Sequence, residues 1–173
     1  MEINLNSTFT AHHQTALITG ASSGIGKALT YEFASQGYQL ILAARSIAKM
    51  KSLAAELQKK FAVTVIVIEA DLETPNGAAL LHADIKSRGI VLCALVNNAG
   101  YFLPGQLQDE PDGQLEAQLN ANLFSAYHLT RDLLPAMIKA KQGHIFNICS
   151  IASLQAYPHG GSYSISKYAL LGF

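Results

Sequence analysis

The sequence predicts an α/β fold in which helices cover both faces of a doubly wound parallel sheet. Three observations support this prediction. Strand-like and helix-like segments alternate along the chain, half of the 173 residues are hydrophobic, and only 14% are charged. The strand-like segments are continuous apolar runs, as in strands buried on both faces. Because βαβ crossovers are right-handed, we expect the strand order 3-2-1-4-5, with a ligand site beyond the carboxyl ends of strands 1 and 4.

The first predicted unit is a strand, a helix and a second strand. Thr15–Thr19 (TALIT) is a short apolar strand, and Gly24–Gln36 is helical because apolar residues recur there at helical spacing. Gly37 suits the left-handed residue with which many helices end. The run Tyr38–Ala44 (YQLILAA) is then the second strand.

The next two units repeat this order. Ser46–Phe61 is predicted to be helical because its apolar residues share one face. The β-branched run Ala62–Ile68 (AVTVIVI) is the clearest strand. A helix over Pro75–Arg88, stopped by Gly89, leads to a fourth strand at Val91–Val96.

One long helix dominates the last third of the chain. It spans Gly113–Lys141, and its Pro135 is expected to produce a kink or a break. His144–Cys149 (HIFNIC) is the fifth strand, and Gly161–Phe173 begins another helix. No internal repeat or convincing linker interrupts the pattern, so residues 14–173 are expected to form one domain.

Composition excludes several classes of partner. The formal net charge is zero, and no cluster of Lys and Arg indicates nucleic acid or an acidic membrane surface as a partner. No stretch approaches the length of a membrane span. Residues 1–13 (MEINLNSTFTAHH) lack the pattern of a signal peptide, so we interpret them as a short, frayed lead-in and expect a cytoplasmic protein.

The cysteines and histidines give no sign of a metal site. Cys93 and Cys149 are the two cysteines of the chain, each inside an apolar run, and both are expected to be buried, reduced thiols. The six histidines show no metal-ligand spacing. No bound metal is expected.

A glycine-rich turn follows the first strand directly. Gly20, Gly24 and Gly26 lie at the strand-to-helix junction, with the spacing G-x-x-x-G-x-G. Glycine there permits a tight turn and lets the backbone approach a pyrophosphate, which the amides at the start of the next helix can hold. Its position after the first strand of an alternating pattern favours a nucleotide site over an ordinary turn.

The ordered motifs resemble those of the classical short-chain dehydrogenase/reductase family. They are Thr19–Gly26 (TGASSGIG), the NNAG at 97–100, Asn122, Ser150, and the pair Tyr163 and Lys167, with Ser150 thirteen residues before Tyr163. The resemblance runs from Thr15 over nearly the whole chain. It implies a Rossmann-type dinucleotide-binding domain that also carries the catalytic residues.

The end of the second strand bears on which cofactor is bound. A carboxylate there would repel a 2′-phosphate, but the sequence has Ala44 followed by Arg45, whose guanidinium can pair with a phosphate in a bidentate manner. NADP is therefore expected, with Ser22 as a second phosphate ligand and NAD as the alternative cofactor. Arg45 could instead be a solvated charge. Asp71 resembles the family's adenine-contacting aspartate, and a surface turn residue is its alternative role.

The full set of cofactor contacts is carried over by resemblance. It comprises Gly20, Ser22, Ser23, Gly24, Ile25, Gly26, Arg45, Asp71, Asn98, Ala99, Gly100, Tyr163 and Lys167.

The segment YSISK places a tyrosine and a lysine one helical turn apart. Residues four apart lie on one face of a helix, so Tyr163 and Lys167 can address one pocket. A fixed cation beside a phenol favours the phenolate form, which suits general acid–base catalysis. An amphipathic pair on a helix surface is the alternative interpretation.

By resemblance, the chain is an NADP(H)-dependent oxidoreductase acting on a small carbonyl or alcohol substrate. Tyr163 would be the general acid and base, and Lys167 would hold the nicotinamide ribose and tune Tyr163. Ser150 would bind the substrate oxygen, and Asn122 would kink the long helix and seat a water. Family members usually assemble as homodimers or homotetramers. A nucleotide-binding module without turnover, acting as a sensor or subunit, is the alternative function.

The chain departs from the family pattern at its C-terminal end. Family members run on for about another third of their length, with two further strands and a substrate loop. We expect a fifth strand uncovered on one side, next to the apolar segment YALLGF. A portion of a longer enzyme and a genuinely short product both fit this pattern.

Overall fold

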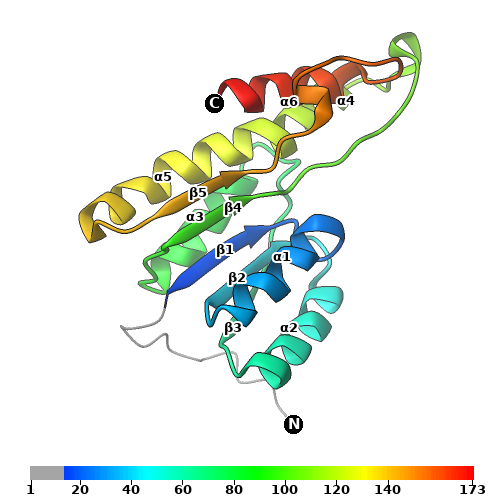
Figure 1. Ribbon diagram of the computed structural model, residues 1–173. Coiled ribbons are helices and arrows are strands. Elements are labelled where there is room, and N and C mark those ends of the chain that lie inside the picture. Colours follow the sequence, from blue (N-terminus) through cyan, green and yellow to red (C-terminus); the bar gives the residue numbers. More distant parts are fainter. Residues whose placement is uncertain (1–13) are drawn as a thin grey trace.

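The computed structural model describes residues 14–173, so the expected lead-in at 1–13 lies outside the described residues. Its centre is a five-stranded parallel sheet in the order β3-β2-β1-β4-β5 (Figure 1). The strands are β1 (Thr15–Thr19), β2 (Gln39–Ala44), β3 (Val65–Glu69), β4 (Ala94–Asn97) and β5 (His144–Asn147). This order confirms the doubly wound topology predicted from the sequence.

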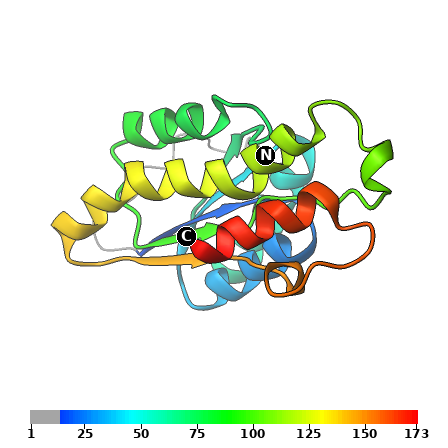
Figure 2. The same cartoon turned by 90° about the horizontal axis from the view of Figure 1, so that it is seen from above.

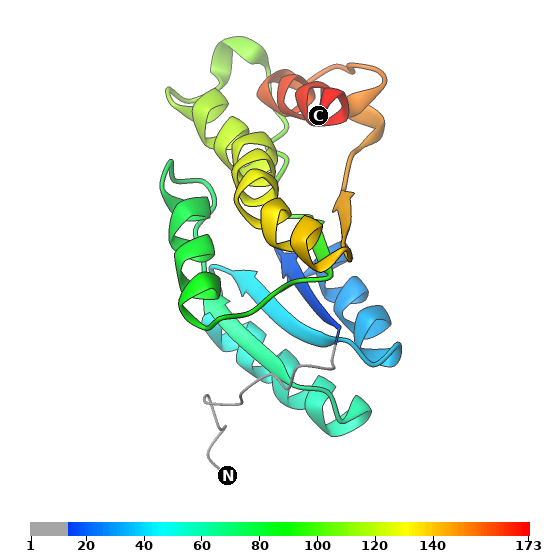
Figure 3. The same ribbon diagram turned by 90° about the vertical axis from the view of Figure 1, so that its left-hand side faces the viewer.

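Helices cover both faces of the sheet (Figure 3). One face carries α1 (Gly24–Ser35) and α2 (Ile47–Phe61), and the other carries α3 (Gly77–Ser87) and α5 (Ser125–Ala140). Successive side chains of a strand point to opposite faces. Ala16 and Ile18 of β1 therefore pack with α1 and α2, whereas Leu17 packs with α3 and α5. Both faces of the central strands are buried, which explains their continuous apolar sequences.

The ends of several elements differ from the sequence prediction by a few residues. Gly37 has the expected left-handed conformation, with φ of 82°, and its amide donates to Ala34 O at 3.0 Å. Ala62 was predicted to begin the third strand, but it ends α2 with φ of 55°, and β3 begins only at Val65. A left-handed residue there reverses the chain direction before the strand.

The long predicted helix consists of three pieces, and the predicted break at Pro135 is absent. The pieces are α4 (Gln114–Leu119), the π-helical turn η2 (Asn120–Phe124) and α5. Pro135 lies inside α5, which continues to Ala140 without a break. Pro135 and Arg131 are both exposed, so water can bind the Arg131 carbonyl that proline leaves without an amide partner. The distortion lies at the turn that contains Asn122 instead.

The last helix, α6 (Gly161–Gly172), packs against α4, η2 and the short 3-10 turn η3 (Ile151–Ser153). Figure 2 shows α6 running beside the start of the long helical segment. Below it, β5 lies at the edge of the sheet, and no described strand pairs with its outer side. His144 and Phe146 are exposed there, which confirms the expected uncovered edge.

Candidate active site

A cavity of about 660 Å³ lies at the carboxyl ends of the strands, at the expected switch point. Its walls come from the loops after all five strands and from α6. Twelve of the thirteen residues predicted to bind the cofactor line it: Gly20, Ser22, Ser23, Gly24, Ile25, Arg45, Asp71, Asn98, Ala99, Gly100, Tyr163 and Lys167. The topology therefore brings together residues that are spread over most of the sequence.

Gly26, the thirteenth residue, does not line the cavity and packs closely against Gly20 and Asn98. A Cβ atom on Gly26 would collide with the carbonyl oxygen of Gly20 and with Asn98 Nδ2. Gly24 has a different role, because its φ is 54° and nothing lies within 4 Å of the position where its Cβ would be. The turn is thus closely packed underneath and open on the cavity side.

The start of α1 faces the cavity with free backbone donors. Its N-cap residue, Ser23, makes no side-chain capping hydrogen bond. The first amides of a helix have no partner within the helix, and they carry a partial positive charge. Gly24 and Ile25, the first residues of α1, both line the cavity. Such a helix start can hold an anionic group.

Thr19 joins the two central strands at the floor of the cavity. Its hydroxyl donates to Val96 O at 3.2 Å and accepts from the amides of Asn98 and Ala99 at 3.0 and 2.9 Å. The Asn98 side chain donates back to Thr19 O at 2.8 Å. The sequence reasoning did not single out Thr19, although it is the first residue of the TGASSGIG motif.

Asn97 braces the sheet on the other side of β4. Its Nδ2 donates to Thr130 Oγ1 at 3.2 Å and to Asn147 Oδ1 at 2.9 Å. Asn97 is buried, and these bonds connect β4 to α5 and β5. It does not line the cavity, so its role is structural.

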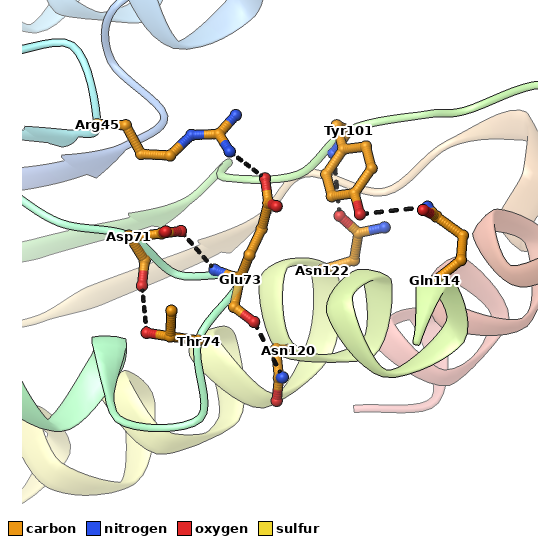
Figure 4. Close-up of polar contacts among 8 residues, drawn as sticks. All are labelled: Arg45, Asp71, Glu73, Thr74, Tyr101, Gln114, Asn120 and Asn122. Atoms are coloured by element: carbon orange, nitrogen blue, oxygen red, sulfur yellow. Dashed lines mark hydrogen bonds and ion pairs between the residues drawn. The ribbon is translucent and has the colours of Figure 1, made fainter. Parts of the chain in front are cut away.

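Arg45 forms an ion pair that the sequence did not predict. Its Nη1 lies 2.5 Å from Glu73 Oε1 (Figure 4). Glu73 also lines the cavity. The Asp71 carboxylate accepts from the Glu73 amide at 3.1 Å, and the Asp71 carbonyl accepts from Thr74 Oγ1 at 2.9 Å. The predicted phosphate ligand is thus paired with a carboxylate in this structure.

Tyr163 and Lys167 face the same cavity from α6. Lys167 Nζ lies 5.9 Å from the centroid of the Tyr163 ring and donates to Ile148 O at 2.8 Å. Lys167 is buried, and this burial lowers its pKa from 10.5, whereas the nearby Cys149 thiol has the smaller, opposite effect. The Tyr163 ring is half-buried and packs on Phe102 at 4.8 Å between centroids.

Asn122 connects the π-helical turn to the cavity wall and to α6. Its Oδ1 accepts from the Tyr101 amide at 3.2 Å (Figure 4). Its Nδ2 donates to Ser166 Oγ at 2.8 Å, and Ser166 Oγ donates to Tyr163 O at 2.8 Å. Asn122 is buried and does not line the cavity. It therefore positions the helix that carries Tyr163.

Ser150 does not line the cavity either. Its hydroxyl accepts from the Ala152 amide at 3.1 Å, and its own amide donates to Ser153 Oγ at 3.1 Å. These bonds form a capping box at the start of η3. The predicted contact between Ser150 and a substrate oxygen stays a prediction.

Glu110 holds the start of α6 and was missed by the sequence reasoning. Its Oε1 accepts from the Ser162 amide at 3.0 Å, and its Oε2 accepts from the Ser162 hydroxyl. A Cβ atom on Gly161 would collide with this carboxylate. Because Glu110 lies far from α6 in the sequence, no local capping pattern could have revealed the contact.

The expectation that both cysteines are buried is wrong, because both are half-buried free thiols. Cys93 Sγ donates to Thr15 O at 3.3 Å, and Cys149 lines the cavity after β5. Within residues 14–173, no group of three His, Cys, Asp or Glu side chains could hold a metal ion. In the same range, no helix has the length and apolar character needed to cross a membrane.

The fold is a Rossmann-type α/β domain, and its cavity joins a glycine-rich turn to a tyrosine–lysine pair. The chain belongs to the short chain dehydrogenase family, whose family model matches residues 14–173. This match confirms the resemblance based on the sequence motifs.

Known proteins similar to the chain include reductases and dehydrogenases. It is 32% identical over 163 residues to 17-beta-hydroxysteroid dehydrogenase type 3 from Homo sapiens, over 92% of this chain and 52% of that protein. L-sorbose reductase from Gluconobacter frateurii, complexed with NADPH and L-sorbose, has a TM-score of 0.87 and 31% identity, over 93% of this chain and 61% of that one.

A metagenomic short-chain oxidoreductase in complex with NADP is also similar. Its TM-score is 0.84 with 34% identity, and the match covers 92% of this chain and 72% of that one. The chain spans about half the length of several curated relatives that it matches.

Proposed function

We propose that the chain binds NADP(H) and belongs to an oxidoreductase that interconverts a carbonyl compound and an alcohol. One observation carries the proposal. Tyr163 and Lys167 of α6 line the same cavity as the glycine-rich turn at the start of α1. A proton donor, a cation and an anion-binding backbone therefore meet in one space, as this reaction requires.

The residues present fit a dinucleotide. The open side of the turn at Gly24 and the uncapped start of α1 suit a pyrophosphate. Arg45 and Lys49 line the cavity after β2 and give it positive charge near the expected adenosine end. The volume is within the range of ligand cavities. The complexes of two similar proteins with NADPH and NADP support the choice of the phosphorylated cofactor over NAD.

The proposed mechanism divides the reaction between cofactor and protein. NADPH, when bound, would supply the hydride for the carbonyl carbon. Tyr163 would donate its hydroxyl proton to the carbonyl oxygen, so that an alcohol forms, and would act as the base in the reverse direction. The Lys167 ammonium would stabilise the phenolate that remains and hold the nicotinamide ribose. Asn122 fixes α6 and would seat a water beside Lys167, and Ser150 would bind the substrate oxygen once its hydroxyl turns from the η3 cap towards the cavity.

Oxidation of NADPH by the full chain, measured with a panel of ketones and aldehydes, tests the proposal. Tyr163→Phe is expected to lower the rate by about 10²- to 10⁴-fold, the range of general acid–base catalysis. Tyr127→Phe is the matched control, because Tyr127 is exposed on α5 and does not line the cavity. An unchanged rate in Tyr163→Phe would contradict the proposed mechanism.

Binding measurements distinguish the alternatives. If NADPH binds and is never oxidised by any substrate, the chain is a nucleotide-binding module without turnover. If NAD binds more tightly than NADP, and Arg45→Asp does not change this order, the cofactor assignment is wrong. We further infer a homodimer or homotetramer, and a cytoplasmic location that fits the two free thiols.

A further inference from the structure

The pair between Arg45 and Glu73 lies in the part of the cavity proposed for the adenosine end. The side chain of Arg45 is 62% exposed and that of Glu73 is 29% exposed. Both residues line the cavity. The guanidinium proposed to bind a 2′-phosphate thus already has an anionic partner within the chain.

Glu73 is the anchored member of this pair. Its amide donates to Asp71 Oδ1 at 3.1 Å, and its carbonyl accepts from Asn120 Nδ2 at 3.0 Å (Figure 4). Asn120 begins the π-helical turn, so the backbone of Glu73 is held between Asp71 and that turn. Arg45, by contrast, has a long and mostly exposed side chain that can change partners.

A carboxylate and a phosphate compete for one guanidinium. Both bind its planar set of N–H donors, preferably in a bidentate manner. An exposed ion pair contributes little net free energy because water and salt screen it. A phosphate monoester carries more charge than a carboxylate and can therefore displace Glu73 from Arg45. The free energy lost when the Arg45–Glu73 pair breaks then offsets part of the free energy gained from the phosphate contact.

We propose that Glu73 is an internal competitor for the 2′-phosphate and that it sets how strongly the site prefers phosphorylated over plain nucleotides. This inference rests on the proposed function, because it assumes a nucleotide in the cavity. The effect is confined to the phosphorylated nucleotide, since a nucleotide without a 2′-phosphate has no need of Arg45.

The experiment measures binding of two fragments, 2′,5′-ADP and 5′-AMP, to the full chain by calorimetry. Glu73→Gln keeps the shape of the side chain and removes its charge. We expect it to tighten 2′,5′-ADP binding by about fivefold, in line with the modest strength of exposed ion pairs, and to leave 5′-AMP binding unchanged. Glu116→Gln, an exposed carboxylate outside the cavity, controls for net charge.

The same substitution in an Arg45→Met chain distinguishes competition for Arg45 from direct repulsion between Glu73 and the phosphate. In Arg45→Met, Glu73→Gln is expected to give no gain for 2′,5′-ADP, because no guanidinium remains to be released. A gain of the same size in that background would overturn the inference, as would equal tightening of both fragments. If neither fragment binds the unaltered chain, the proposed function fails together with the inference.

Discussion

At the scale of single residues, Lys167 combines a catalytic requirement with a cost in stability. A buried ammonium group is separated from water, and its hydrogen bond to Ile148 O replaces only part of its hydration. Its lowered pKa is the measure of this cost. A position that would be apolar in a purely structural helix is thus occupied by a cation that faces Tyr163.

The lowered pKa of Lys167 predicts a pH-dependent effect on stability. The unfolded chain binds the proton more tightly than the folded chain, so burial destabilises the fold below the folded-state pKa. This destabilisation disappears as the pH rises from that value towards 10.5. The free energy of unfolding of Lys167→Met, relative to the unaltered chain, should therefore be highest near neutral pH and decline as the pH approaches 10.5.

Denaturant unfolding at several pH values measures this difference. Lys139→Met is the control, because Lys139 is exposed near the end of α5. The difference in free energy of unfolding between Lys139→Met and the unaltered chain should stay constant over the same pH range. A stability difference for Lys167→Met that does not vary with pH would show that the ammonium is hydrated in the folded chain.

Among elements, α6 is positioned by contacts that come from distant parts of the sequence. Glu110 binds its first turn, Asn122 binds Ser166 in its middle, and Lys167 reaches the end of β5. Three separate segments thus fix the rotation of α6 about its axis. That rotation decides whether Tyr163 faces the cavity.

Removal of the Glu110 carboxylate should loosen the start of α6. Glu110→Ala takes away an acceptor for the Ser162 amide and a negative charge at a helix N-terminus. We expect the free energy of unfolding to fall by about 1–2 kcal/mol, as for other lost N-terminal caps. Asp112→Ala in the same loop, an exposed side chain, should have almost no effect on it. Equal losses in the two variants would exclude a capping role for Glu110.

How far the sequence predicted these elements depends on the range of the interactions involved. Gly37 and the glycine-rich turn were predicted correctly because local backbone conformation determines them. The strand order was predicted correctly because alternating strands and helices with right-handed crossovers allow few topologies. The boundary at Ala62 was missed by a few residues, since a non-glycine residue in the left-handed conformation gives little sequence signal.

The errors in the candidate site have a different origin. Glu73 and Glu110 were missed because each acts on a residue that only the fold brings near. A break at Pro135 was expected from its strong local signal, but α5 continues through it. The interruption of the long helix lies in the π-helical turn that contains Asn122, where the resemblance had implied a kink and where the Asn122 side chain bonds to groups of other elements.

For the whole molecule, the uneven distribution of exposed apolar side chains is informative. Several lie on α5, on α6 or directly after α6: Tyr127, Leu134, Ile138, Tyr168, Leu171 and Phe173. The rings of Tyr127 and Phe173 are in contact, with centroids 5.6 Å apart, so the two helices share part of this surface. We propose that these side chains form the contact of the homodimer or homotetramer inferred above.

A charge on this surface should therefore weaken self-association. Leu171→Lys is expected to shift the chain from dimer towards monomer in sedimentation velocity at equal concentration, because the ammonium must lose its water in the contact. Leu80→Lys is the control, since Leu80 is 70% exposed and lies on α3, outside the proposed α5 and α6 contact. A Leu171→Lys variant that sediments like the unaltered chain would mean that α5 and α6 do not form the contact.

The π-helical turn has one more consequence, for insertions and deletions. The i→i+5 turn accommodates one extra residue between α4 and α5 without changing which faces the two helices present. Deletion of a single residue between Asn120 and Phe124 would let the turn return to α-helical geometry and leave the relative rotation of α4 and α5 nearly unchanged. Gln118 would stay buried, whereas Asn122 would lose the wider turn that now holds it. The extra residue in this turn therefore affects the placement of Asn122 more than the orientation of α4.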